Sequence, residues 1–471
     1  MLKKFKRIFV LLLAVVLSLT IFTGCIQVIL PSDVLTIEKT GTDGYVDTYT
    51  ITYTDGRTST FTITNGRNGI DGEDGDDSPT ISIDELYARY RLENPTATYE
   101  EFLKAFLNVE VDINAVTINK LLSSSVKIYT EFTTTKEDET KSLIVGAASG
   151  VIYKITDDYT YLITNFHVIY ENKQNTTSKI ARKIVCYLYG SELTPKDTGT
   201  KDQDGYEIYK YGNNGIECEF VGGSITKDIA VLRVDTSVIK SVNENITAIE
   251  FADSYHVGET AVAIGNANDD GISVTKGIVS VDCERVRLKI DETVRVYDLL
   301  RMDTPSYQGN SGGGLFNVEG KLIGITNAGD TKDQNVNFAV PLDTVKNSVE
   351  NILHYKNGYI NKILFGLVVE LTDSKYVYNK VTGYGQIVEE LTISTIEENS
   401  LASSLGLQVK DILTALNVNG TPCEIYRDYI LTDKILTLRQ GDSISITYTR
   451  NGVSYTTANY VIKAEDIQPS A

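Results

Sequence analysis

The feature that most constrains the fold is a long succession of short β-type runs. From about Ile113 onward, stretches of β-branched and aromatic residues alternate with turns rich in Gly, Asn and Asp. Many short strands separated by such turns are typical of a β-barrel or a β-sandwich. We therefore expect a mainly β protein.

Composition narrows the class of protein. Hydrophobic residues make up 42% of the 471-residue chain and charged residues 23%, which is ordinary for globular protein and argues against wholesale disorder. A length prior of roughly 150 residues per domain predicts about three domains. Acidic residues outnumber basic ones by 63 to 44, whereas nucleic-acid binding needs a positive surface. We therefore expect no nucleic-acid partner.

Three short motifs in the β-rich region carry residues suited to catalysis. In the first, an apolar run ends at Thr164 and His167 follows at the turn. The second places Asp228 directly before the run Ile-Ala-Val-Leu. The third, Gln-Gly-Asn-Ser-Gly-Gly over residues 308–313, sets Ser311 among glycines, whose backbone can approach a substrate closely.

Together these residues supply what acyl transfer requires. A serine hydroxyl is a poor nucleophile at neutral pH and needs an adjacent base, for which imidazole has a suitable pKa. A carboxylate on the other ring nitrogen fixes the tautomer and stabilises the imidazolium. Backbone N–H groups freed by the glycines can point at the developing oxyanion.

Each motif alone has an ordinary structural explanation as a loop, a cap or a structural histidine. Their conjunction, in the order His167, Asp228, Ser311, favours a catalytic triad. The chain has only two other histidines: His256 precedes a Val-Gly-Glu turn and His354 lies near an expected helix end. His167 is therefore the candidate base.

With these motifs in view, the region resembles a trypsin-like serine protease of the HtrA/Deg type. The resemblance covers about residues 115–350, and we assign residues 112–356 to this domain. It implies two perpendicular β-barrels, with His167, Asp228 and Ser311 in the cleft between them. It also implies an oxyanion hole on Gly309, Asn310 and Ser311, and no metal or organic cofactor. Further matching segments are residues 263–266, 273–280, 303–305, 320–325 and 337–341.

The sequence departs from the family pattern in three places. Gln308 and Gly314 stand where the family has prolines, which loosens the loop that carries the nucleophile. We hypothesise that the oxyanion hole is poorly formed until substrate arrives. The third departure is a polar insertion over residues 191–214, expected to be a surface loop. Cys186 and Cys218 flank it and could pair across a hairpin or remain free, buried thiols.

Residues 360–466 resemble the bacterial PDZ domain that follows the protease in this family. A glycine-containing turn opens the first strand, a short helix begins at Ser400 and stops at Gly406, a second helix is expected over residues 424–438, and a closing strand begins at Ser443. Lys410 stands where the family has glycine.

The PDZ resemblance implies β-strand addition by a peptide C-terminus. Its carboxylate would be held by backbone N–H groups near Phe365, Gly366 and Leu367. The alternative is that this domain only packs against the rest of the protein and binds no ligand.

Residues 25–111 are expected to form a stalk with a spacer or docking role. Asp55-Gly56 between alternating runs predicts a β-hairpin, and a glycine-rich acidic spacer completes residues 25–78. The spacer's clustered aspartates could bind calcium, although their spacing fits no known loop. Residues 79–111 are expected to be helical, broken at Asn94-Pro95.

Residues 1–24 read as a secretory signal, with four basic residues before a short apolar run. Small residues before Cys25 resemble the bacterial lipoprotein signal, which implies lipidation of this cysteine. The alternative is an uncleaved transmembrane anchor. We expect an extracytoplasmic protein held at the bacterial cell membrane by its lipid.

The resulting expectation is a serine endopeptidase that cuts misfolded or unfolded proteins, with the family resemblance suggesting homotrimers. Two alternatives stay open. One is a surface adhesion or binding lipoprotein on an inert protease scaffold. The other is a specific processing or host-directed protease.

Overall fold

A computed structural model describes residues 34–44, 46–53, 56–64, 83–95, 102, 113–135, 139–172, 174, 179–290, 293–329, 335–380 and 383–470. The chain divides into two compact units, Met1–Glu110 and Val111–Ala471. The predicted signal segment, Cys25 and the acidic spacer lie outside the described residues. Within the described ranges, no helix is both long and apolar enough to cross a membrane.

The first unit contains the predicted hairpin. Strands β2 (Val46–Tyr53) and β3 (Thr58–Thr64) pair antiparallel, and the rings of Tyr49 and Phe61 stack with centroids 5.3 Å apart. Strand β1 (Val34–Asp43), which the sequence did not predict, adds to the free edge of β2. Helix α2 (Ile83–Glu93) ends directly before Asn94-Pro95, as expected from the restriction that proline places on its predecessor.

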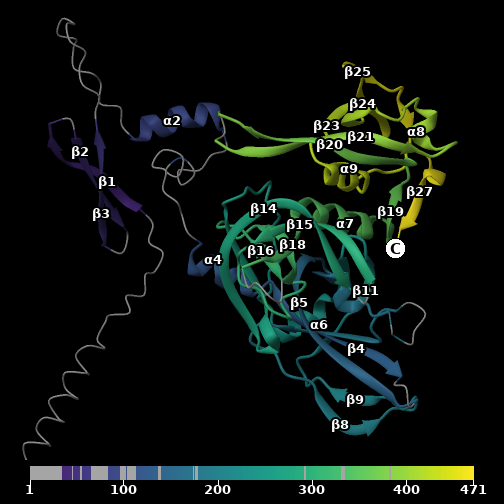
Figure 1. The fold of residues 1–471 in the computed structure, drawn as a ribbon. Helices are drawn as coiled ribbons and strands as arrows, with labels where there is room; N and C mark the ends of the chain where they lie inside the picture. Colours follow the sequence, from purple (N-terminus) through teal and green to yellow (C-terminus); the bar gives the residue numbers. More distant parts are fainter. Residues whose placement is uncertain are drawn as a thin grey trace, which may run out of the picture. The chain divides into compact units, whose positions relative to one another are not determined.

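The second unit begins with helix α4 (Ala115–Leu122), which a nine-stranded sheet follows (Figure 1). Strands β10 and β11 are separated only by Cys218, yet they pair with β7 and β12 at different positions in the sheet. Apolar side chains such as Ile128, Ile152 and Leu162 fill the interior. The strands, in spatial order, are β10 (Ile216–Glu217), β7 (Lys183–Leu188), β4 (Ser125–Thr135), β5 (Lys141–Ile155), β6 (Tyr159–Thr164), β12 (Ile229–Asp235), β11 (Glu219–Ser224), β19 (Gly358–Ile363) and β27 (Ile467–Ser470).

Six further strands form a closed barrel. Its interior combines small side chains, among them Ala261 and Ala263, with Leu300 and Met302. In order around the barrel they are β13 (Thr260–Asn266), β14 (Ile272–Ile290), β15 (Thr293–Met302), β18 (Asn337–Pro341), β17 (Leu322–Gly329) and β16 (Gly314–Phe316).

Helix α7 (Leu342–Tyr355) follows the last barrel strand and packs into a core shared by the two sheets. Val345, Val349 and Ile352 of α7 lie in this core with Val151 of the first sheet and Val262 of the barrel. Short helices α5 (Phe166–Ile169) and α6 (Thr236–Val242) complete the region. The predicted mainly β architecture is confirmed.

The C-terminal domain is a separate sheet with its own core, which includes Ile393, Leu416 and Ile444. Its strands run in the order β20 (Leu367–Tyr378), β21 (Gly385–Ile396), β22 (Ile412–Val418), β24 (Ser443–Arg450) and β25 (Val453–Thr456), with β23 (Thr421–Glu424) and β26 (Tyr460–Val461) at its sides. Helix α8 (Leu401–Ser404) lies where a short helix was predicted, and the side chain of Ser400 caps it. Helix α9 (Asp428–Ile435) is shorter than the predicted 424–438, because Glu424 ends β23. Strands β20 and β21 extend outward as a long ribbon (Figure 1).

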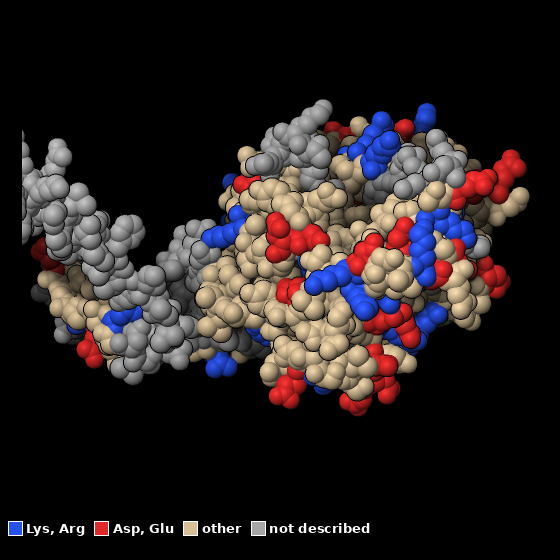
Figure 2. All heavy atoms as spheres, turned by 90° about the horizontal axis from the view of Figure 1, so that it is seen from below, with Lys and Arg blue, Asp and Glu red and all other residues tan. Residues whose placement is uncertain are grey.

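Acidic and basic side chains are interleaved on the face of the molecule shown in Figure 2. The opposite charges therefore neutralise one another locally on that face, although the formal net charge of the chain is −19.

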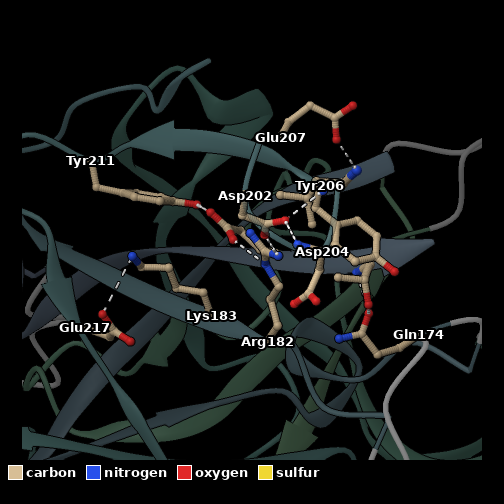
Figure 3. Close-up of polar contacts among 12 residues, drawn as sticks. Gln174, Arg182, Lys183, Asp202, Asp204, Tyr206, Glu207, Tyr211 and Glu217 are labelled. Atoms are coloured by element: carbon tan, nitrogen blue, oxygen red, sulfur yellow. Dashed lines mark hydrogen bonds and ion pairs between the residues drawn. The ribbon is translucent and has the colours of Figure 1, made fainter. Parts of the chain in front are cut away.

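The insertion at 191–214 contains an ordered hairpin, β8 (Lys196–Lys201) and β9 (Glu207–Lys210), where the sequence predicted a surface loop (Figure 1). Figure 3 shows Arg182 in contact with Asp202 of this insertion. Arg182 joins it to the first sheet: its Nε lies 2.9 Å from buried Glu131 and its Nη1 lies 2.8 Å from Asp202. The hydroxyl of Tyr211 donates to Glu131 as well. Cys186 and Cys218 are free, buried thiols, which is one of the two alternatives that the sequence left open.

Candidate active site

His167 and Asp228 come together because β6 and β12 are paired neighbours. His167 follows β6 in the single-turn helix α5, and Asp228 stands just before β12. The imidazole Nδ1 lies 2.7 Å from Asp228 Oδ2, and the backbone N–H of His167 donates to Oδ1 at 2.8 Å. Asp228 adopts a left-handed φ of 51°, which aspartate tolerates better than most residues.

The aspartate is fully buried and its charge is compensated by hydrogen bonds. Besides His167, the side chain of Asn327 donates to Asp228 Oδ2 at 2.5 Å, and Asn165 Nδ2 donates to the Asp228 carbonyl. Burial alone would lower the pKa of His167, but the charge and hydrogen bond of Asp228 outweigh it and raise that pKa. The arrangement therefore stabilises an imidazolium.

Ser311 is connected to His167 and Asp228 through hydrogen bonds of Asn327. Among the described residues, Ser311 Oγ donates to the main-chain carbonyl of Asn327 at 2.7 Å and not to the ring of His167. Asn327 thus bonds Asp228 through its side chain and Ser311 through its backbone. The structure therefore joins His167 to Asp228 directly and connects Ser311 to them through one intervening residue.

The loop that carries Ser311 needs its glycines and is anchored to the first sheet. Gly309 has a φ of 97°, and a Cβ there would lie 2.2 Å from the Asn266 carbonyl. Ser149 of β5 donates its N–H to the Ser311 carbonyl at 2.9 Å and its hydroxyl to the Gly309 carbonyl at 2.7 Å. These bonds hold the loop although Gln308 and Gly314 replace prolines.

Two of the three predicted oxyanion-hole N–H groups are available. The N–H of Asn310 is engaged, because it donates to the Tyr307 carbonyl at 3.0 Å. Within the described part of the chain, no acceptor is bonded to the N–H of Gly309 or Ser311. The Gln308 carbonyl accepts from Asn268 N–H at 2.7 Å. In a trans peptide the next N–H points the opposite way, so this bond leaves Gly309 N–H free.

Comparison with known proteins identifies the kind of domain that holds these residues. Residues 148–325 match the family model described as a trypsin-like peptidase domain. The chain is 31% identical over 324 residues to a probable periplasmic serine protease do/HhoA-like from Haemophilus influenzae, covering 67% of this chain and 58% of that protein. It is 28% identical to a serine protease Do-like HtrA from Bacillus subtilis, covering 69% of this chain and 65% of that protein. These matches support a serine protease of the HtrA/Deg type.

A solved HtrA-type protease, AlgWS227A with decapeptide, also aligns with the chain, with a TM-score of 0.47 and 21% identity. The alignment covers 76% of this chain and 98% of that one. The chain spans less than two thirds of the length of the two curated HtrA-type relatives named above.

Sequence reasoning missed two residues of this candidate site. Asn327 lies just after the matching segment 320–325, and Ser149 lies on β5 far from any of the three motifs. Neither stands in a local pattern that indicates chemistry. Their contacts with Asp228 and with the nucleophile loop arise from strand pairing across the whole domain, which no single stretch of sequence reveals.

The C-terminal domain borders a groove with a cavity of about 320 Å³, which Thr226 and Lys227 also line. Phe365, Gly366 and Leu367 line it together with Leu431 and Ile435 of α9. Gly366 has a φ of 69°, and its carbonyl accepts from Glu397 N–H. Among the described residues, the N–H groups of Phe365 and Gly366 have no acceptor.

Proposed function

We propose that this chain is an extracytoplasmic serine endopeptidase in which Ser311 is the nucleophile, His167 the general base and Asp228 its orienting carboxylate. The observation that carries the proposal is the 2.7 Å bond between His167 Nδ1 and the buried carboxylate of Asp228. That bond occupies Nδ1 and leaves Nε2 to accept the proton of a serine. Gly309 and Ser311 supply the oxyanion-hole N–H groups.

Catalysis begins when Ser311 Oγ leaves the Asn327 carbonyl and turns its proton toward His167 Nε2. The oxygen attacks the scissile carbonyl carbon while the proton passes to the imidazole, and the resulting oxyanion accepts from the N–H groups of Gly309 and Ser311. Breakdown expels the amine, which takes the proton from His167. Water then hydrolyses the acyl-enzyme by the same proton transfers and regenerates Ser311.

The substrate class that fits is an extended polypeptide, as in misfolded or unfolded proteins. No group in this sequence of steps requires a metal or an organic cofactor. The trimer suggested by the family resemblance remains part of the proposal, with gel filtration as its test. Profiling cleavage sites in a peptide library would separate general turnover of unfolded chains from a specific processing or host-directed protease.

Casein cleavage by the unsubstituted protein beside Ser311→Ala tests the proposal. We expect cleavage by the first and a loss of at least about a thousandfold in the second, since the remaining groups lack a nucleophile. Casein binding without Ser311-dependent cleavage would instead indicate an inert scaffold used for adhesion.

The C-terminal domain is proposed to bind peptide C-termini as a PDZ domain. The free N–H groups of Phe365 and Gly366 beside an apolar groove support carboxylate capture next to an added strand on β20. A peptide with an apolar C-terminal residue should bind, and its amidated form should bind at least tenfold more weakly. If the free and amidated peptides bound equally well, carboxylate capture would be wrong, and the domain would only pack against the rest of the chain.

We also propose that a lipid on Cys25 anchors the chain at the membrane. The relatives named periplasmic support an extracytoplasmic location. Expression with labelled palmitate should label the protein, and Cys25→Ser should abolish the label. Labelling of both forms would contradict the anchor.

A further inference from the structure

A three-residue turn of the closed barrel contacts the loop that carries Gly309 and Ser311, here called the oxyanion loop, and is fixed by the first sheet. The turn is η1 (Ala267–Asp269), and its Asp269 is bound by two side chains of β4. Lys127 Nζ lies 2.6 Å from Asp269 Oδ1 and 3.0 Å from the Asp269 carbonyl. The hydroxyl of Tyr129 donates to the same Oδ1 at 2.7 Å.

Lys127 and Tyr129, the two β4 residues in these contacts, are shielded from water. The side chain of Lys127 is only 3% exposed and Tyr129 is buried, whereas Asp269 is 39% exposed. Burial, reinforced by the bond to Asp269, raises the pKa of Tyr129, so the phenol stays protonated and can donate. A buried lysine needs a partner, and among the described residues Asp269 provides both of its polar contacts.

The turn has a backbone shape that its own residues do not favour. Asn268 and Asp269 both have a left-handed φ, 54° and 65°. Consecutive non-glycine residues in this region are strained and persist where surrounding contacts fix them. The contacts of Asp269 with Lys127 and Tyr129 supply that restraint.

The turn's shape determines which way the oxyanion loop faces. Asn268 presents its N–H to the Gln308 carbonyl at 2.7 Å. Because the peptide between Gln308 and Gly309 is planar and trans, bonding its carbonyl to Asn268 turns the Gly309 N–H to the opposite side. If Asn268 moved, this peptide could rotate, since Gly309 allows a wide range of φ.

We propose that Asp269 is a positioning residue for the oxyanion hole: ion-paired to Lys127 and bonded to Tyr129, it holds the Asn268 N–H against the Gln308 carbonyl and so keeps the Gly309 N–H pointing at the reacting carbonyl. The proposal rests on the proposed peptidase function. It assigns to β4 of the first sheet a role in the oxyanion hole, whose N–H groups lie on the loop before β16 of the closed barrel.

The test is steady-state kinetics of Asp269→Asn on a peptide substrate, with Asp270→Asn as the matched control. Asp270 is the next residue, is exposed, and its side chain has no partner among the described residues. We expect kcat of Asp269→Asn to fall about ten- to hundredfold, up to the loss typical of one missing oxyanion donor. KM should change less than threefold, the acid limb of the pH profile should not move, and the affinity for a peptide boronate should fall in parallel with kcat. Asp270→Asn should match the unsubstituted protein.

Tyr129→Phe provides a second variant if Asp269→Asn fails to fold, because it removes one hydroxyl and keeps the ring. It should lower kcat and boronate affinity by a smaller, roughly threefold to tenfold factor. Unchanged kcat in either folded variant, or a fall in melting temperature without a change in kcat, would overturn the positioning role. Ser311→Ala, measured alongside, separates the two failures: if the unsubstituted protein shows no Ser311-dependent turnover, the peptidase function itself fails, and this proposal with it.

Discussion

Lys227 Nζ lies 2.8 Å from Asp433 Oδ1, which joins the residue before Asp228 to helix α9 of the C-terminal domain. Both side chains are largely buried, and Thr344 of α7 donates to the other oxygen of Asp433 at 2.6 Å. Lys227 and Thr432 also line the groove proposed to bind peptides. One ion pair therefore links the groove, α7 and the turn that holds Asp228.

Breaking this pair from one side should be costly. Lys227→Met leaves Asp433 buried without its counter-ion, and we expect a loss of about 3 kcal/mol in the free energy of unfolding. The double variant with Asp433→Asn should lose less than the sum of the two single losses. Denaturant unfolding measures this. Lys120→Met, at the exposed pair with Glu250, is the control and should stay within about 0.5 kcal/mol. Additive losses at Lys227 and Asp433 would show that the pair is not coupled.

The acid limb of kcat/KM should have its midpoint above about 6.5, the ordinary pKa of histidine. Asp228 raises the pKa of His167, and only the neutral imidazole can accept the serine proton, so activity rises as the pH increases through that raised value. Asp228→Asn removes the charge and should move the midpoint to lower pH while kcat falls about ten-thousandfold. A midpoint that stays in place in Asp228→Asn would contradict this origin.

Asn327→Leu should reduce kcat about tenfold with little change in KM. The side-chain amide no longer donates to Asp228, so the carboxylate is less compensated and should raise the pKa of His167 further. The acid limb should therefore shift to higher pH. Asn327→Thr keeps a donor and should recover part of kcat. If Asn327→Leu lost folding stability but its acid limb did not shift, Asn327 would have a structural role only.

Lys410→Gly should stabilise the C-terminal domain by about 1 kcal/mol. Lys410 has a φ of 78°, a conformation that L side chains adopt at a cost and glycine does not. Lys410→Ala keeps the Cβ and should show no such gain. Thermal unfolding of the two variants compares them, and equal melting temperatures would mean that the strain is absorbed elsewhere.

The parts of this protein that sequence reasoning reached are those encoded locally. The β-type runs, the short helix that begins at Ser400, the helix end before Pro95 and the order of His167, Asp228 and Ser311 all follow from neighbouring residues. The predicted resemblance to HtrA/Deg-type serine proteases is confirmed as well, by the matched peptidase domain and by the HtrA-type relatives.

What the sequence could not predict depends on contacts between distant segments. Asn327 reaches Asp228 across 99 residues, and Lys127 reaches Asp269 across 142. The hairpin at 191–214 is ordered through Arg182 and Glu131, which lie outside it. Polar side chains of this kind acquire a role only when the sheets are assembled, since their local surroundings resemble those of any loop or strand.

The two ends of the C-terminal domain are fastened to the same place. Strand β19 leads into it and pairs with β11 of the first sheet, and β27 returns from it to pair with β19. A domain attached through a single flexible linker can tumble independently, whereas this one cannot detach without unzipping both strands. Any movement that a bound peptide caused in it would have to bend the first sheet or be resisted by it.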